Sequence, residues 1–69
     1  MKPSKAFNGQ RLKTARLFRG MTVADLAAQM ELNRQTVSQY ESGQISDPGY
    51  LRIQDMSRIL NFPFDFFIL

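Results

Sequence analysis

The hydrophobic positions of the chain recur with helical spacing in four stretches, and residues that start or stop helices separate these stretches. The first stretch has one helical face made of Leu12, Ala15, Arg16 and the aliphatic stem of Arg19. Asn8 can cap this helix by accepting hydrogen bonds from free amide groups, and Gly20 ends it. We therefore expect a first helix between these two residues, preceded by a flexible arm over 1–7.

Two short helices are predicted next, joined by a tight turn. Thr22 and Asp25 have the spacing of a capping box at the start of the second helix, and Asn33 can cap the third, which runs to Glu41. Gly43 follows and stops the third helix. The side chains expected to face the core are Leu26, Ala27 and Met30 in the second helix and Val37 and Tyr40 in the third.

The last third of the chain, over 47–69, predicts a fourth helix and a short C-terminal turn. Asp47 suits the N-cap and Pro48 the first helical position, while Asn61 suits a left-handed C-cap and Pro63 opens the final turn. The core face of this helix is predicted to contain Tyr50, Ile53, Met56, Ser57 and Leu60. Strand signals are negligible, so the sequence predicts one compact all-α domain over 1–69 with four to five helices.

An almost continuous apolar run over 62–69 ends the chain. We expect Phe62 and Phe66 to pack inward and other apolar side chains to lie open to another surface. These others are some of Phe64, Phe67, Ile68 and Leu69, together with Leu17 and Phe18, which lie off the core face of the first helix. A protein partner could cover them, or the helices could simply pack on each other.

The absence of cysteine and histidine excludes several classes of chemistry. Disulfides, the usual zinc ligand sets, Ser-His and Cys-His nucleophile pairs and an imidazole base are unavailable, so we expect no enzyme, metal site or cofactor. No apolar run approaches the roughly 20 residues that span a bilayer, and no signal peptide is recognisable. We expect a cytoplasmic protein that is not associated with a membrane.

The charge is uneven along the chain, although the net charge is only +3. From Gly20 onward three cations stand against six carboxylates, whereas six cations precede the first acidic residue, Asp25. These six cations are Lys2, Lys5, Arg11, Lys13, Arg16 and Arg19. The cluster fits a patch that binds phosphates, and equally a solvated helix face behind a basic leader.

The predicted third helix combines amide and guanidinium side chains, with no carboxylate between Asn33 and Tyr40. Its polar side chains are Asn33, Arg34, Gln35, Ser38 and Gln39. In the major groove of DNA, arginine pairs bidentately with guanine and glutamine with adenine. A generic solvated helix mixes glutamate among its lysines and arginines, so this composition favours DNA reading over a merely solvated surface.

The segments TVADLA at 22–27 and RQTVSQYESG at 34–43 resemble the helix-turn-helix of the lambda-repressor/Cro-like (XRE) family. The resemblance extends to 10–16 and 19–22 and to 48–63, and so covers nearly the whole chain. It implies a lambda-repressor-like fold with the helix-turn-helix over 22–41. It also implies sequence-specific binding to double-stranded DNA in transcriptional regulation, as a bacterial or phage-like repressor.

The resemblance assigns roles to individual residues. Base contacts fall on Arg34, Gln35 and Gln39, and a structural ion pair between the first and third helices falls on Arg16 and Glu41. Phosphate or secondary contacts are expected from Thr22, Asn33, Thr36, Ser38, Ser42, Gln44, Ser46 and Arg11.

The sequence departs from the family pattern at two positions. Val23 stands where the family often has a glutamine that touches a phosphate, and Glu31 stands where the turn often has glycine. A left-handed backbone at Glu31 would cost on the order of 1 kcal/mol. The loop after Gly43 lacks lysine and arginine, so we expect a lone domain to bind DNA with modest affinity.

The family resemblance also predicts a larger assembly. A palindromic operator requires two protomers, so we expect a homodimer, or a further C-terminal domain, that contacts Leu17, Phe18, Phe64, Phe67 and Ile68. Similar domains often form the N-terminal part of a longer protein, in some cases fused to a zinc-metallopeptidase domain. The alternative function is a protein-interaction or antitoxin module that binds a partner through its aromatic C-terminal end.

Overall fold

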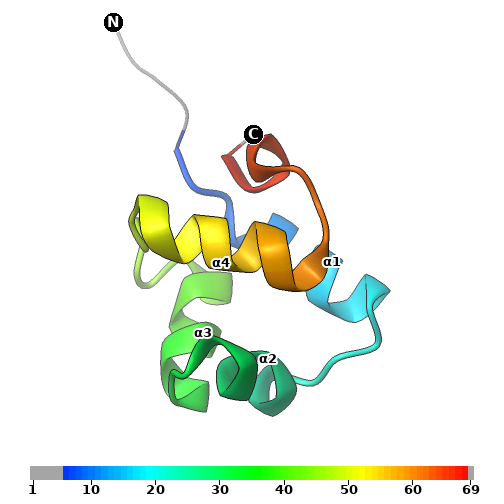
Figure 1. Ribbon diagram of the computed structural model, residues 1–69. Helices are drawn as coiled ribbons and strands as arrows, with labels where there is room; N and C mark the ends of the chain where they lie inside the picture. Colours follow the sequence, from blue (N-terminus) through cyan, green and yellow to red (C-terminus); the bar gives the residue numbers. More distant parts are fainter. Residues whose placement is uncertain (1–5, 69) are drawn as a thin grey trace, which may run out of the picture.

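The structure, a computed structural model, describes residues 6–68, which form helices joined by short turns (Figure 1). The elements are α1 (Gly9–Phe18), α2 (Val23–Met30), α3 (Arg34–Ser42), α4 (Tyr50–Leu60) and the 3-10 helix η1 (Phe64–Ile68). Within this part of the chain there is no strand, and no helix is long and apolar enough to cross a membrane. The all-α class and the order of the helices predicted from the sequence are confirmed.

Local capping explains where the first three helices begin. The side-chain oxygen of Asn8 accepts from two amides in the first turn of α1, at 3.0 and 3.4 Å, and that of Asn33 accepts from the Thr36 amide at 2.9 Å. A capping box at Thr22 starts α2. The turn from α2 to α3 passes through Glu31 at φ 58° and ψ 40°, so this non-glycine residue adopts the left-handed conformation that the family position requires.

The start of α4 differs from the prediction. Asp47 and Pro48 were expected to be its cap and first residue, whereas α4 begins at Tyr50 and Gly49 is its N-cap. The Asp47 carboxylate accepts from the Gly49 amide at 3.0 Å, which closes a turn before the helix. Gly49, the last residue of this turn, has a φ of 90°, a conformation that favours glycine. The helix therefore starts at Tyr50, two residues later than predicted.

The helices α2 and α3 pack on each other at one end of the molecule (Figure 1). α1 packs against α3 and α4, and η1 packs against α1 and α4. The described chain ends on the side away from α2 and α3 (Figure 1). A surface at the C-terminal end and a surface on α3 can therefore be occupied at the same time.

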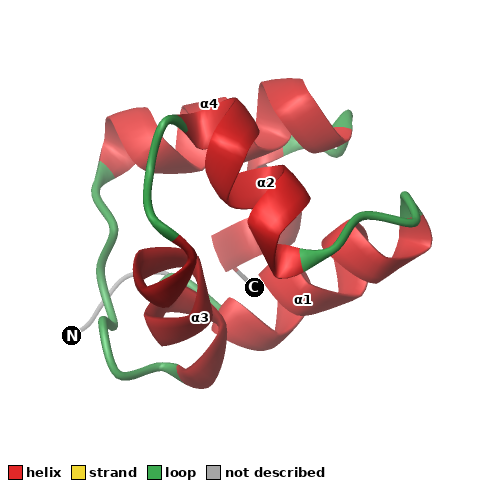
Figure 2. Ribbon diagram, turned by 90° about the horizontal axis from the view of Figure 1, so that it is seen from below, coloured by secondary structure: helices red, strands yellow, loops and turns green. Residues whose placement is uncertain are grey.

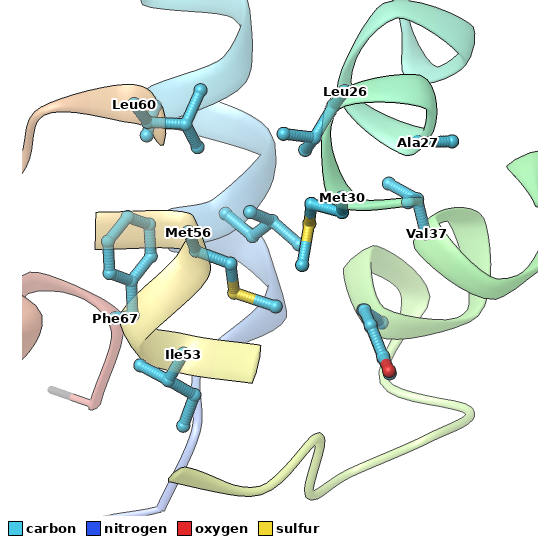
Figure 3. Close-up of a cluster of buried hydrophobic side chains, with 11 residues drawn as sticks. Leu26, Ala27, Met30, Val37, Ile53, Met56, Leu60 and Phe67 are labelled. Carbon is cyan, nitrogen blue, oxygen red and sulfur yellow. The ribbon is translucent and has the colours of Figure 1, made fainter. Parts of the chain in front are cut away.

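The core lies where the four α-helices and η1 meet. Figure 3 shows Ile53, Met56, Leu60 and Phe67 on one side of it and Leu26, Ala27, Met30 and Val37 on the other. Leu12, Ala15 and Tyr40 complete the buried set. The sequence pattern placed ten of these eleven side chains in the core, and the exception is Phe67.

Phe67 was expected at an open surface, but it is 0% exposed. Phe62 and Phe66, expected inside, are half-buried and stack on each other with ring centroids 4.7 Å apart. The backbone carbonyl of Phe67 accepts from the Asn8 amide at 2.7 Å, and this contact ties η1 to the start of α1. The prediction was wrong because nearly every position of this run is apolar, so the spacing does not show which ring faces the core.

Tyr50 also differs from its predicted place on the core face of α4. Its side chain is 62% exposed and its ring lies outside the core against Phe64, at a centroid distance of 5.2 Å. The predicted arm over 1–7 ends earlier than expected, because Phe7 is half-buried and packs edge-on against Tyr40. Residues 1–5 of that arm lie outside the described residues.

Two of the side chains predicted to be exposed to solvent are exposed. Leu17 is 58% exposed and Phe18 is 73% exposed, at the end of α1. Phe64 and Ile68 are half-buried, and Leu69 lies outside the described residues.

Gly9 stands where the start of α1 approaches the end of α3 most closely. A Cβ atom on Gly9 would lie 2.1 Å from the carbonyl oxygen of Tyr40 and 2.9 Å from that of Glu41. In an open helix, alanine is more stable than glycine by about 1 kcal/mol. At Gly9 the clash reverses this preference, so we expect Gly9→Ala to destabilise the protein. The free energy of unfolding should fall by about 1 to 3 kcal/mol, the usual cost of overpacking.

Urea unfolding followed by circular dichroism measures this effect. Gln10→Ala, at the exposed neighbouring position of α1, is the matched control and should leave stability nearly unchanged. A Gly9→Ala protein as stable as the natural chain would show that α1 and α3 are not in such close contact.

Candidate nucleic-acid interface

The helix α3 presents one apolar and one polar face. Val37 and Tyr40 are buried against the core. The outward side chains are Arg34, Gln35 and Ser38, which are exposed, and Gln39, which is half-buried. Seen from below, α3 and α2 are the elements nearest the viewer, and no other element of the described chain covers them (Figure 2).

Two shallow hollows lie along this outer face. The first is lined by Gln35, Ser38, Gln39, Ser42 and Gln44, which offer neutral hydrogen-bond donors and acceptors. The second lies between α2 and α3 and is lined by Val23, Arg34, Gln35 and Ser38. Gln35 and Ser38 border both hollows, so the three residues expected to contact bases lie on one continuous surface.

Several of the residues expected to make secondary contacts form bonds within the protein. The Asn33 side-chain oxygen accepts from the amide and the hydroxyl of Thr36, at 2.9 and 3.0 Å. The Ser42 hydroxyl donates to a carbonyl of α3 at 3.2 Å and accepts from the Gln44 amide at 3.3 Å. These bonds fix both ends of α3. Ser46 lies exposed in the following loop.

A complete capping box closes the start of α2. The Thr22 hydroxyl accepts from the Asp25 amide at 3.0 Å, and the Asp25 carboxylate accepts from the Thr22 amide at 2.9 Å. The hydrogen bonds from Thr22 hold the pKa of Asp25 below its ordinary value. An ionised carboxylate therefore occupies the helix end at which a phosphate would otherwise be favoured.

The lowered pKa of Asp25 makes this cap sensitive to pH. Its contribution to stability is complete above the pKa of the unfolded chain, about 3.9, and is lost as the pH falls through the lower pKa of the folded chain. We expect the difference in stability between the natural chain and Asp25→Asn to be constant near neutral pH and to shrink under acid conditions. Urea unfolding across an acid pH series measures it, and a difference independent of pH would contradict a charged cap.

Two arginines of the N-terminal cluster bind backbone carbonyls in the C-terminal part of the chain. Arg11 donates to the Phe66 carbonyl at 3.3 Å, and its guanidinium lies 4.7 Å from the centre of the Phe66 ring. Arg19, exposed and not packed on the core face as predicted, donates to two carbonyls at the end of α4, at 2.7 and 3.0 Å. Both guanidinium groups are engaged away from α3, so Arg11 is not among the DNA contacts that we propose below.

The third arginine, Arg16, forms the predicted ion pair with Glu41. Its Nε donates to Oε2 of Glu41 at 2.6 Å, and a second nitrogen donates to Oε1 at 3.1 Å. Both side chains are only 8% exposed, and Arg16 also donates to the Met21 carbonyl at 2.9 Å. The hydrogen bond to Glu41 raises the pKa of Arg16. The pair connects α1 and the turn before α2 to the end of α3.

Few cations remain near α3 for contacts with phosphates. Lys13 is exposed on α1, and Lys2 and Lys5 lie outside the described residues. Over 20–46 the sequence contains a single cation, Arg34. The described residues also contain no group of three or more acidic, histidine or cysteine side chains that could hold a metal ion.

Comparisons with known proteins agree with this geometry. The family model for a helix-turn-helix matches residues 12–67. No curated protein sequence matches the chain. The restriction-modification controller protein C.AhdI from Aeromonas hydrophila has a similar structure, with a TM-score of 0.77 and 27% identity over 86% of this chain and 88% of that one.

Two other solved structures share the fold. SinR, the master regulator for biofilm formation, in complex with DNA, has a TM-score of 0.78 and 22% identity, over 84% of this chain and 95% of that one. Hydroxypropylphosphonic acid epoxidase from S. wedmorenis has a TM-score of 0.84 and 20% identity, over 97% of this chain and 36% of that one. The chain thus spans about a third of the length of the epoxidase.

Proposed function

The chain belongs to the helix-turn-helix family of the lambda-repressor/Cro-like (XRE) type, and we propose that it is a transcriptional regulator that binds double-stranded DNA sequence-specifically. The outer face of α3 carries the proposal, because Arg34, Gln35 and Gln39 lie there without a carboxylate among them. The solved complex of SinR with DNA and the controller protein C.AhdI support it, since both share the fold. The proposal assigns no catalytic step to the chain.

In this proposal α3 enters the major groove, which is wide enough for one helix. Arg34, at the helix start, reaches deepest and donates to N7 and O6 of a guanine. Gln35 and Gln39 lie one turn apart on the same side of α3 and pair with adenines further along the groove. The bonds at Asn33 and Ser42 hold both ends of α3, so these side chains project from a fixed backbone.

We further propose that two copies bind one palindromic operator. A single recognition helix covers few base pairs, and half-sites about 34 Å apart present successive major grooves on one side of the duplex. The domain measures 37 × 22 × 18 Å, so two copies fit side by side at this spacing. The exposed Leu17 and Phe18 at the end of α1, which lies away from α3 in both views, would contact the second copy (Figures 1 and 2).

Selection from a random duplex pool tests the proposed function. The selection is repeated at about 50 and 200 mM salt, because contacts with phosphates weaken steeply with ionic strength. We expect enrichment of a two-fold symmetric site at both concentrations. Binding that shows no sequence preference and disappears at the higher salt would contradict a sequence-specific regulator.

A second candidate function rests on the same exposed side chains. Leu17 and Phe18, 58% and 73% exposed, form an apolar surface on a small domain, and such surfaces mark sites of protein interaction. A partner protein, as for an antitoxin, or a further domain of a longer chain would cover them. Alanine at Arg34, Gln35 and Gln39 separates the two functions, because it removes the proposed base contacts and leaves Leu17 and Phe18 in place. DNA binding should then be lost while binding of a protein partner is retained.

A further inference from the structure

Among the described residues that line the hollow between α2 and α3, Val23 alone has an apolar side chain. It is the first residue of α2, and Arg34, Gln35 and Ser38 form the rest of the lining. Part of the side chain packs against the core, and the rest stays accessible, since Val23 is half-buried. Figure 2 shows the start of α2 beside α3 on the face nearest the viewer. Val23 therefore adjoins the residues that we propose to contact bases.

The start of α2 is poorly suited to hold a phosphate in this protein. Val23 has no side-chain donor, and the Thr22 amide already donates to the Asp25 carboxylate at 2.9 Å. That carboxylate is exposed and negatively charged at neutral pH, so it repels a phosphate. The accessible part of Val23 can instead contact an apolar group of the DNA.

The major groove offers one apolar group on its base edges, the C5 methyl group of thymine. We propose that Val23 contacts the C5 methyl group of a thymine next to the bases contacted by Arg34 and Gln35. The protein then contacts base edges from α2 as well as from α3. Through this contact it distinguishes thymine from cytosine at one position of the half-site. The inference rests on the proposed function, because it places α3 in the major groove.

Deoxyuridine tests this contact, since uracil differs from thymine only by the missing methyl group. In the duplex obtained by selection, each thymine of the half-site is replaced singly by deoxyuridine, and affinity is measured by fluorescence anisotropy. We expect one position at which the natural chain loses about fourfold in affinity, the equivalent of one buried methyl group. Val23→Ala should bind the thymine duplex more weakly and should lose the response to uracil at that position.

The matched control is Leu51→Ala, which shortens an exposed apolar side chain on α4 and should keep the full response to uracil. Circular dichroism checks that both variants are folded. Equal affinity for thymine and uracil at every position, or an undiminished response in Val23→Ala, would overturn the inference while the selected site still supported the proposed function. If selection gives no specific site, the proposed function and this inference fail together.

Discussion

Replacing Arg34, Gln35 and Gln39 together by alanine abolishes sequence-specific DNA binding and leaves the domain folded. Arg34 and Gln35 are exposed, Gln39 is half-buried, and none of the three belongs to the hydrophobic core, so we expect the substitutions to leave the core intact. A good bidentate contact discriminates against the wrong base by about 1 to 3 kcal/mol. The loss of three contacts should lower the affinity for the selected duplex by at least about a hundredfold.

A matched triple variant controls for general effects of surface charge. Gln10→Ala, Gln54→Ala and Arg58→Ala remove the same side-chain types from exposed positions on α1 and α4. We expect this variant to bind the selected duplex as the natural chain does, with only a small loss from the missing cation. Equal affinities for the two triple variants would show that α3 does not contact the bases.

Removing Arg16 should have the largest effect on stability. Arg16→Ala leaves the Glu41 carboxylate, only 8% exposed, without its partner and frees the Met21 carbonyl. Breaking a buried ion pair in this way costs about 3 to 5 kcal/mol. A domain of this size has little stability in reserve, so we expect Arg16→Ala to be largely unfolded at room temperature by circular dichroism.

Replacing both partners tests whether the stranded charge is the cause. Arg16→Met with Glu41→Leu leaves no buried charge, and we expect it to recover most of the lost stability. Arg58→Ala breaks an exposed ion pair with Asp55 and should cost less than about 1 kcal/mol. If Arg16→Ala lowered the free energy of unfolding as little as Arg58→Ala does, the Arg16–Glu41 pair would not be a structural connection between α1 and α3.

Features set by neighbouring residues could be predicted from the sequence. The caps at Asn8, Thr22 and Asn33 and the left-handed C-cap at Asn61 depend on a few consecutive residues, and all of them are present. At Asp47 two local motifs competed, and the turn closed by the Gly49 amide replaced the expected cap.

Features set by distant contacts could not be predicted. Phe67 is buried in the core, and its carbonyl accepts from the Asn8 amide, a contact across almost the whole chain. The sequence shows that Arg11 and Arg19 are charged, but not that backbone carbonyls of the C-terminal part bind both of them. The guanidinium groups of Arg11 and Arg19 therefore looked more available to phosphates than they are.

Methylation interference tests most directly whether α3 reads the major groove. Dimethyl sulfate methylates guanine at N7 in the major groove and adenine at N3 in the minor groove. In the selected duplex, we predict that N7 methylation of one guanine per half-site blocks binding of the natural chain, and that Arg34→Ala loses this sensitivity. Interference confined to adenine N3, or none at any guanine, would contradict the docking of α3 in the major groove.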